Sequence, residues 1–275
     1  MIHFICALLA EARPIIEFYQ LKHIGHDGLF NIYYNEAAEV SLTVSGVGKL
    51  ACSAASIYSF DVLDSNASDV WINVGIAGHE KHPIGKLFLA NYIEDQGSNL
   101  SWYPQILIKT NIEQENLLTL DKPSNQYDKN LFDMEASGFM HSCSRFSTME
   151  LIHSLKIISD NALQPSLAIQ KSEITLLVKN NLVNITQFAQ QLRELSADLN
   201  KQPDIENQFM LITNKSHFSH YQRNRLRSIL SRWQLINQGT EANFYLDESL
   251  RSAEEIMSFL ENHLDNLPMH FSTGK

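Results

Sequence analysis

The stretch VSLTVSGVGKLA, residues 40–51, contains the unit that decides the fold. Residues 40–44 form an apolar, β-branched run that is typical of a buried strand. A glycine-rich turn follows, and the pattern from Lys49 to Phe60 predicts a helix. A strand that leads through a short turn into a helix is the basic unit of an α/β protein.

The same alternation continues on both sides of this unit. We predict further strands at residues 2–9, 29–34, 70–74, 87–93, 105–109, 117–120 and 155–158, and a further helix at 133–146. Strands that alternate with helices imply an α/β fold with a largely parallel or mixed central sheet.

The pattern changes after Asp160. The later elements are an amphipathic stretch at 183–199, a linker at 201–204, an apolar and basic stretch at 209–233, and a helix at 246–267 capped by Asp247. We therefore predict a main α/β domain at residues 1–199 and a small, mainly helical appendage at residues 200–275.

Composition excludes several functional classes. The chain has 275 residues, with 21 Lys+Arg against 31 Asp+Glu, which gives a net charge of -10. An acidic chain is a poor non-specific binder of nucleic acid. We find neither a 20-residue apolar run nor a basic start typical of a signal peptide, so we expect a cytoplasmic protein without a membrane partner. The three cysteines, Cys6, Cys52 and Cys143, are widely spaced and odd in number, which argues against a disulfide framework. Each has apolar or small neighbours, so we expect it to be a small buried residue.

The turn at Ser45-Gly46-Val47-Gly48-Lys49 first suggests a phosphate-binding loop. That motif needs Gly and Ser/Thr where this chain has Thr43 and Leu50, so it fails. The dinucleotide-binding fingerprint also needs an acid after the next strand, and Gly75 stands there. The turn either lets the backbone approach a ligand closely or is purely structural.

Small residues and acids follow the predicted buried strands. Gly75-Ile76-Ala77-Gly78 would leave room for a ligand at the carboxyl end of a strand, although a tight turn explains it as well. Asp133 and Glu135 open the predicted helix at 133–146, where Asp133 could act as a cap. Ser159-Asp160 and Glu11 follow two other strands. Glu11, Glu135 and Asp160 together form a plausible acid/base set for breaking a glycosidic-type bond.

Five motifs occur in one order: ALLAEARPII, SGVGKLA, NVGIAG, DMEASGF and IISDNA. This series resembles the nucleoside phosphorylase/nucleosidase superfamily, and most of all its branch of methylthioadenosine/S-adenosylhomocysteine nucleosidases. The resemblance covers residues 1 to about 162. It implies a mixed, partly barrel-like sheet flanked by helices, and an enzyme of purine nucleoside metabolism that cleaves a ribosyl N-glycosidic bond. Such an enzyme is a hydrolase if water attacks, or a glycosyltransferase if phosphate attacks.

The resemblance also implies roles for individual residues. Glu11 would activate water, Asp160 would protonate the purine base at N7, and Glu135 would hold the ribose 2′- and 3′-hydroxyls. Met134 would pack under the sugar, and Val47 would lie near the 5′ substituent. The remaining expected substrate-binding residues are Ile76, Ala77, Gly78, Asp133 and Ser159.

Departures from the family pattern leave the reaction open. Ile76 replaces a Ser of the nucleosidases, Asn73 stands where phosphate-using relatives often have Arg, and Lys156 replaces an Arg. We favour water over phosphate as nucleophile, with phosphate a possible co-substrate and with Arg13 and Lys156 as possible anion contacts. The alternatives are a phosphorylase or a weakened, nucleoside-binding protein, because the segment between Leu117 and Asp133 is short for the family.

We expect no metal and no cofactor. His79-Glu80-Lys81-His82 departs from the HExxH zinc signature, since its second histidine comes one position too early. The family resemblance implies a homo-oligomer, with a dimer favoured, whose partner is a small nucleoside substrate. Candidates for stacking on the base are Tyr127, Phe132, Trp102 and Tyr103, although ordinary packing explains each of them too.

Overall fold

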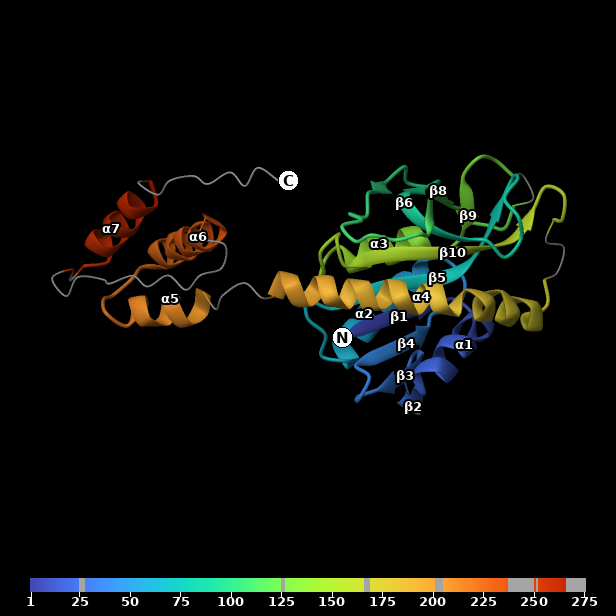
Figure 1. Ribbon diagram of the computed structural model, residues 1–275, viewed down its shortest axis with the longest axis horizontal. Coiled ribbons are helices and arrows are strands. Elements are labelled where there is room, and N and C mark those ends of the chain that lie inside the picture. The colour runs from blue at the N-terminus through green and yellow to red at the C-terminus, as the bar shows by residue number, and fades with distance from the viewer. Residues whose placement is uncertain are drawn as a thin grey trace. The chain divides into compact units, whose positions relative to one another are not determined.

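The chain divides into two compact units, Met1–Ala197 and Asp198–Lys275, and we describe each by itself (Figure 1). The computed structural model describes residues 1–24, 28–124, 127–165, 169–200, 205–236, 250 and 252–265. The division lies close to the boundary that the sequence predicts between residues 199 and 200.

The described residues form ten strands and seven helices. The strands are β1 (Ile2–Cys6), β2 (Lys22–Ile24), β3 (Asn31–Asn35), β4 (Val40–Val44), β5 (Val70–His79), β6 (Leu87–Asp95), β7 (Ser101–Trp102), β8 (Glu113–Thr119), β9 (Leu131–Asp133) and β10 (Ile152–Asn161). The helices are α1 (Leu9–Tyr19), α2 (Lys49–Val62), α3 (Ala136–Cys143), α4 (Lys171–Asn200), α5 (Ile205–Thr213), α6 (His220–Ile236) and α7 (Ala253–Asp265).

Five strands of the first unit close into a barrel. Strand β5 pairs with β10, and the ring continues through β6, β8 and β9 back to β5. An open arm leaves the barrel on the other side of β5, through β1, β4, β3 and β2. Parallel and antiparallel pairs both occur, so the predicted mixed and partly barrel-like sheet is confirmed.

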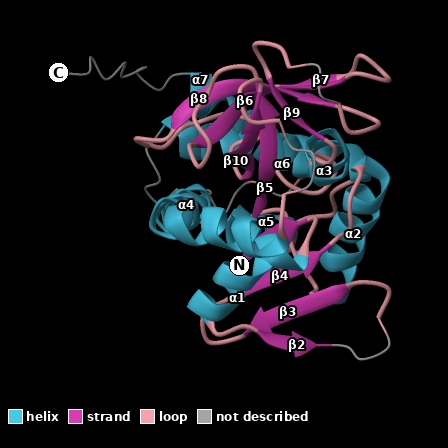
Figure 2. Ribbon diagram, turned by 90° about the vertical axis from the view of Figure 1, so that its right-hand side faces the viewer, coloured by secondary structure: helices cyan, strands magenta, loops and turns pink. Residues whose placement is uncertain are grey.

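Helices cover the sheet in two layers, with α1 and α4 on one face and α2 and α3 on the other (Figure 2). Each layer buries one apolar core. Ile15 of α1 and Phe188 of α4 belong to the first core, whereas Cys52 of α2 and Phe139 of α3 belong to the second. All three cysteines are buried with free thiols, and burial raises their pKa values above the usual range for thiols.

The second unit has an apolar core of its own. Helices α5, α6 and α7 contribute to it, with Phe209, Leu226 and Leu260 among its buried side chains. The basic residues of α6 are used locally: Arg225 forms an ion pair with Glu261 of α7, and the Arg227 guanidinium lies 4.1 Å from the centre of the Phe209 ring. The predicted linker at 201–204 and the predicted cap Asp247 fall outside the described residues.

Three sequence predictions about elements are wrong. Residues 105–109 form no strand; they cross the first core as an irregular segment in which Ile106 and Ile108 pack inward. The strand predicted at 70–74 ends too early, because β5 continues to His79 beside β10, and Gly75–Gly78 is therefore not the tight turn that the sequence also allowed. The helix expected from Asp133 begins at Ala136, since Asp133 pairs with Thr119 at the end of β9.

Among the helices formed by the described residues, none combines the length and the apolar composition required to cross a bilayer.

Candidate functional site

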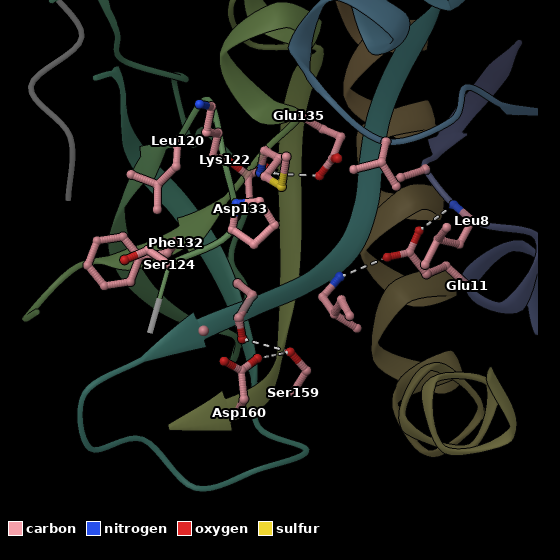
Figure 3. Close-up of a pocket in the computed structure, with 17 residues that line it drawn as sticks. Leu8, Glu11, Leu120, Lys122, Ser124, Phe132, Asp133, Glu135, Ser159 and Asp160 are labelled. Atoms are coloured by element: carbon pink, nitrogen blue, oxygen red, sulfur yellow. Dashed lines mark hydrogen bonds between the residues drawn. The ribbon is translucent and has the colours of Figure 1, made fainter. Parts of the chain in front are cut away.

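A pocket of about 220 Å³ opens at the carboxyl ends of the central strands of the first unit (Figure 3). Ligands of open α/β sheets commonly bind at this edge, because the loops that follow the strands converge there. The lining residues are Ala7, Leu8, Glu11, Val47, Ile76, Ala77, Gly78, Leu120, Lys122, Pro123, Ser124, Phe132, Asp133, Met134, Glu135, Ser159 and Asp160. All the predicted catalytic and substrate-binding residues are in this set.

Glu11 reaches the pocket from the first turn of α1. Its Oε2 accepts a hydrogen bond from the Leu8 N–H at 2.8 Å, and its Oε1 accepts one from the Ile76 N–H at 3.1 Å. Burial raises the pKa of Glu11 to about 7, although the two N–H groups and the nearby Lys156 favour the charged form. The Ile76 side chain cannot replace a serine hydroxyl, but its backbone N–H orients this carboxylate.

Glu135 approaches the pocket from the residue before α3. Its Oε1 accepts a 2.8 Å hydrogen bond from the Gly48 N–H, in the turn that joins β4 to α2. Gly48 has a φ of 103°, which glycine adopts without strain, so this turn aims its N–H at the carboxylate. Burial and the neighbouring Asp133 raise the pKa of Glu135. The carboxylate keeps lone pairs for further donors, such as ligand hydroxyls.

Lys156 lies at the base of the site as a buried cation, with 1 % of its side chain exposed. Its Nζ forms a 2.8 Å ion pair with Asp133 Oδ2. A methyl group built on Gly75 would lie 3.3 Å from the same Nζ and 3.2 Å from Glu11 Oε1, so the lysine also adjoins Glu11. Burial alone would lower the pKa of Lys156, but Asp133, Glu135 and Glu11 raise it. Lys156 is therefore the counter-charge of three carboxylates.

Asp160 stands at the other end of the pocket, on β10. Its Oδ1 accepts a 2.5 Å hydrogen bond from Ser159 Oγ, and its Oδ2 accepts a 2.7 Å bond from the Tyr127 hydroxyl. Figure 3 shows Glu11, Glu135 and Asp160 directed into one space from three sides. The site thus combines acids from three separate elements, which is an arrangement suited to proton transfer and to holding a polyhydroxyl ligand.

The two predicted anion contacts lie outside this pocket. Lys156 is committed to Asp133, as described above. Arg13 lines a neighbouring cleft instead. Asn73 is also away from the pocket lining, since its side chain donates to the Ile5 carbonyl and accepts from Ser154 Oγ.

The stacking candidates separate into two groups. Phe132 lines the pocket, and Tyr127 bonds to Asp160. Trp102 and Tyr103 make aromatic contacts with His141 and Tyr92 respectively.

Sequence reasoning missed several pocket residues. Lys122, Pro123 and Ser124 belong to the short segment between β8 and β9, and they form one wall of the pocket. Ala7 and Leu8 follow β1. The position of Lys122-Pro123-Ser124 directly after a strand could have indicated them, but their composition reads as an ordinary turn.

One cluster has the composition of a metal site. Ligand atoms of His79, His82 and Glu115 lie within 4.8 Å of one another. His79 is already committed on both nitrogens: Nδ1 accepts from the backbone N–H of Lys81 and of His82, and Nε2 lies 3.0 Å from the Lys129 carbonyl. A cation bound to His79 would have to displace these hydrogen bonds. Without His79, only His82 and Glu115 of this cluster would be available as ligands.

The comparison with solved structures identifies the fold. No family model and no curated protein sequence matches the chain. Solved structures match it over about two thirds of its length. The structure of Arabidopsis thaliana 5′-methylthioadenosine nucleosidase aligns with a TM-score of 0.55 and 16 % identity, over 68 % of this chain and 95 % of that one.

Two bacterial structures give the same result. The Campylobacter jejuni 5′-methylthioadenosine/S-adenosylhomocysteine nucleosidase aligns with a TM-score of 0.54 and 14 % identity, over 70 % of this chain and 98 % of that one. The futalosine hydrolase of Helicobacter pylori aligns with a TM-score of 0.51 and 14 % identity, over 67 % and 95 %. The chain therefore has the nucleosidase fold, and the resemblance drawn from its motifs is confirmed at that level.

Proposed function

We propose that this protein cleaves the N-glycosidic bond between ribose and the base of a purine nucleoside, with water as the nucleophile. The observation that carries the proposal is the convergence of Glu11, Glu135 and Asp160 on one pocket. These acids come from α1, the turn before α3, and β10. The fold that the chain shares with nucleosidases supports the same reaction class.

The substrate's orientation follows from the chemistry of the two ends of the pocket. Glu135 has acceptor capacity for the ribose 2′- and 3′-hydroxyls, and Met134, which lines the pocket next to it, would pack under the sugar. Asp160 would face N7 of the base, where a proton makes the base a better leaving group. Ser159 and Tyr127 fix the orientation of Asp160, and their hydroxyls can donate or accept as its protonation changes.

Glu11 is suited to removing a proton from the attacking water. The bond to the base breaks as positive charge develops on the sugar, in a transition state like that of other glycoside cleavages. A general base acts most effectively when its pKa is close to the working pH, and burial places the pKa of Glu11 at about 7. Lys156, which favours the charged form of Glu11, forms its ion pair with Asp133 beside it.

Hydrolysis is favoured over phosphorolysis because the pocket is short of anion-binding groups. Among the described residues that line it, Lys122 is the only cation, whereas Glu11, Asp133, Glu135 and Asp160 all carry carboxyl groups. Asn73, at the position where phosphate-using relatives often have Arg, is turned into the sheet. A phosphate beside Glu11 and Glu135 would be repelled by their charges.

The test is to incubate the protein with adenosine, inosine, methylthioadenosine and S-adenosylhomocysteine, with and without phosphate. Free base and free sugar are measured by chromatography. We expect base release without phosphate, at least about 100-fold slower in Glu11→Gln and in Asp160→Asn. Asp61→Asn, an exposed acid on α2, is the matched control and should retain full activity.

Three other outcomes would each redirect the proposal. Base that forms only with phosphate would make the protein a phosphorylase. Calorimetric binding of a nucleoside that is never cleaved, and that weakens in Glu135→Ala, would make it a nucleoside sensor. No binding and no cleavage of any of the four nucleosides would refute the proposed site.

We also propose that the protein forms a dimer through α2. Val47, Leu50 and Ile57 are spaced along one face of this helix and its preceding turn, and Leu50 is 82 % exposed. A contiguous exposed apolar stripe commonly marks a protein interface. Light scattering should show a dimer in the parent and a monomer in Leu50→Glu/Ile57→Glu. Val183→Glu, at an exposed apolar position of α4, should remain dimeric.

A further inference from the structure

His79 is a buried side chain that the proposed reaction does not use. Its Nδ1 accepts hydrogen bonds from the backbone N–H groups of Lys81 and His82, both at 3.0 Å. A ring nitrogen that accepts carries no proton, so the imidazole is neutral and has its proton on Nε2. This Nε2 lies 3.0 Å from the Lys129 carbonyl oxygen and therefore donates a hydrogen bond to it.

Lys129 belongs to the segment between β8 and β9, which this bond ties to the end of β5. A second bond joins the same two parts of the chain, from the Glu80 N–H to the Asp128 carbonyl at 3.2 Å. Tyr127 directly precedes these two anchored residues. The hydrogen bond from His79 thus limits how far the backbone beside Tyr127 can move away from β5.

Tyr127 meets Asp160 beside a glycine of β5. A methyl group built on Gly78 would lie 3.2 Å from Tyr127 Cε1 and 3.0 Å from Asp160 Oδ2, so both side chains closely approach the backbone at this point. The Tyr127 hydroxyl donates its 2.7 Å hydrogen bond to Asp160 Oδ2 here. The described contacts therefore connect His79, through the backbone of residues 127–129, to Asp160.

We propose that His79 is a positioning residue for the departure of the base, because it holds Tyr127 where the tyrosine hydroxyl orients Asp160 toward N7. The inference rests on the proposed function. In that reaction Asp160 gives its proton to N7, the bond between the ribose C1′ and N9 breaks, and the bonding electrons pass to the base. The hydrogen bond from Tyr127 stabilises the Asp160 carboxylate that remains, since a bond to an ionised acceptor is stronger than one to a neutral acceptor.

Substitution can separate the two ends of the imidazole. In His79→Asn, the side-chain oxygen can take the place of Nδ1 and accept from the turn after β5, but no donor reaches Lys129. In His79→Gln, the amide nitrogen can take the place of Nε2 and donate to Lys129. The first variant therefore removes the bond to the Tyr127 segment, and the second restores it.

The experiment measures kcat and KM for two substrates: the fastest-cleaved of the four purine nucleosides tested above, and p-nitrophenyl β-D-ribofuranoside. p-Nitrophenolate leaves as a stable anion without N7, so its departure does not need the proton of Asp160. We expect kcat for the nucleoside to fall about tenfold in Tyr127→Phe and in His79→Asn, as the loss of one hydrogen bond would give. In His79→Gln it should stay within about twofold, as should kcat for the nitrophenyl riboside in all three variants.

The double variant His79→Asn/Tyr127→Phe shows whether one residue acts through the other. If His79 acts through Tyr127, the double variant should cleave the nucleoside no more slowly than Tyr127→Phe alone. Tyr221→Phe, at an exposed position of the second unit, is the matched control and should equal the parent with both substrates.

An unchanged kcat for the nucleoside in His79→Asn would overturn the inference. Equal losses with both substrates would also overturn it, because they would show a general disturbance of the fold, and so would losses that multiply in the double variant.

A parent protein that cleaves no purine nucleoside would refute the proposed function separately. In that case, or if the nitrophenyl riboside is not cleaved, dissociation constants decide the positioning role. They are measured for adenine and 7-deazaadenine, and for hypoxanthine and 7-deazahypoxanthine. A preference for the base with N7 that is lost in His79→Asn and in Tyr127→Phe supports the inference, and an unchanged or absent preference overturns it.

Discussion

Lys156 is the residue whose position constrains the site most tightly. Its ammonium group is buried with Asp133, Glu135 and Glu11 around it, and it forms a direct ion pair with Asp133. Removing one partner of a buried ion pair is costly, because the remaining charge has no water to solvate it. The three acids therefore depend on this one lysine.

We predict that Lys156→Met lowers the free energy of unfolding by about 3–5 kcal/mol, since it leaves buried carboxylates without their counter-charge. Urea unfolding measures this loss. Lys156→Arg keeps the charge and should lose less than half as much, and Lys179→Met, at an exposed site, should change stability by less than about 0.5 kcal/mol. A Lys156→Met protein as stable as the parent would show that the acids are not charged together.

We predict that activity rises with pH and reaches half its maximum near pH 7. Glu11 acts as a base only when it is ionised, and burial raises its pKa from 4.5 to about 7. On the limb that Glu11 controls, kcat/KM is thus low below about pH 6 and rises through pH 7. Replacing Lys156 by Met removes a charge that favours the ionised form, so the half-maximum should move to higher pH. The pH dependence of kcat/KM measures the midpoint in the parent and its shift in Lys156→Met. An unchanged midpoint in Lys156→Met would show that Glu11 is not the group whose ionisation raises the activity.

At the residue scale, the sequence predicts the three acids that line the pocket, but it does not predict the residues that pair with them. Glu11 and Asp160 can be named because each follows an apolar run that predicts a buried strand. Glu135 can be named because apolar and small residues surround it, and a buried carboxylate needs a partner. Sequence assigns Lys156 to anion binding, because no pattern in one strand shows that Asp133, from a different strand, will lie beside it. Tyr127, which bonds to Asp160, comes from a segment without periodicity.

At the element scale, the contact between α2 and α3 determines the position of Glu135. Gly138 lies in α3 directly against the start of α2, and a methyl group built on it would overlap the Lys49 carbonyl group, 2.6 Å from its carbon. A backbone atom cannot rotate away as a side chain can. The two helices can approach this closely only because residue 138 is glycine.

We predict that Gly138→Ala lowers the free energy of unfolding by about 3 kcal/mol, because the methyl group forces the helices apart. The same displacement should lengthen the bond between the Gly48 N–H and Glu135 and raise KM for the nucleoside. Thermal unfolding and steady-state kinetics measure the two effects. Asn180→Ala, which places alanine at an exposed position of α4, is the control and should stay within about 0.5 kcal/mol of the parent. A Gly138→Ala protein of parental stability and KM would contradict the packing described here.

The elements differ in how far periodicity can predict them. Strand β4 and the start of α2 are predicted to the residue, because an apolar run and a glycine turn mark them locally. Residues 105–109 are predicted as a strand because Ile106 and Ile108 alternate with polar residues. This alternation shows only that the side chains of Ile106 and Ile108 face the core. A strand also needs a neighbouring strand to pair with, which usually comes from a distant part of the chain. Residues 105–109 pair with no strand of the described sheet.

At the scale of the whole molecule, each unit buries its own apolar core. The two cores of the first unit use residues up to Leu195, whereas the core of the second unit uses residues from Ile205 onward. All the pocket residues belong to the first unit. The change of pattern after Asp160 predicts this division. The helices of the second unit contain no motif that indicates a function.

We predict that a chain ending at Asn200 folds and cleaves nucleosides as the parent does, because it retains both cores and the whole pocket. Circular dichroism, thermal unfolding and kcat/KM measure these properties. A truncated chain that folds but has lost more than about tenfold in kcat/KM would show that the second unit takes part in catalysis.

The three cysteines of the chain have a practical consequence. All are buried with raised pKa values, so they are neither accessible to an alkylating reagent nor present as the reactive thiolate. The three natural cysteines of the native protein are therefore expected not to react with thiol reagents. A single cysteine introduced at an exposed position such as Lys179 would carry a fluorophore or spin label selectively, without first removing the natural cysteines.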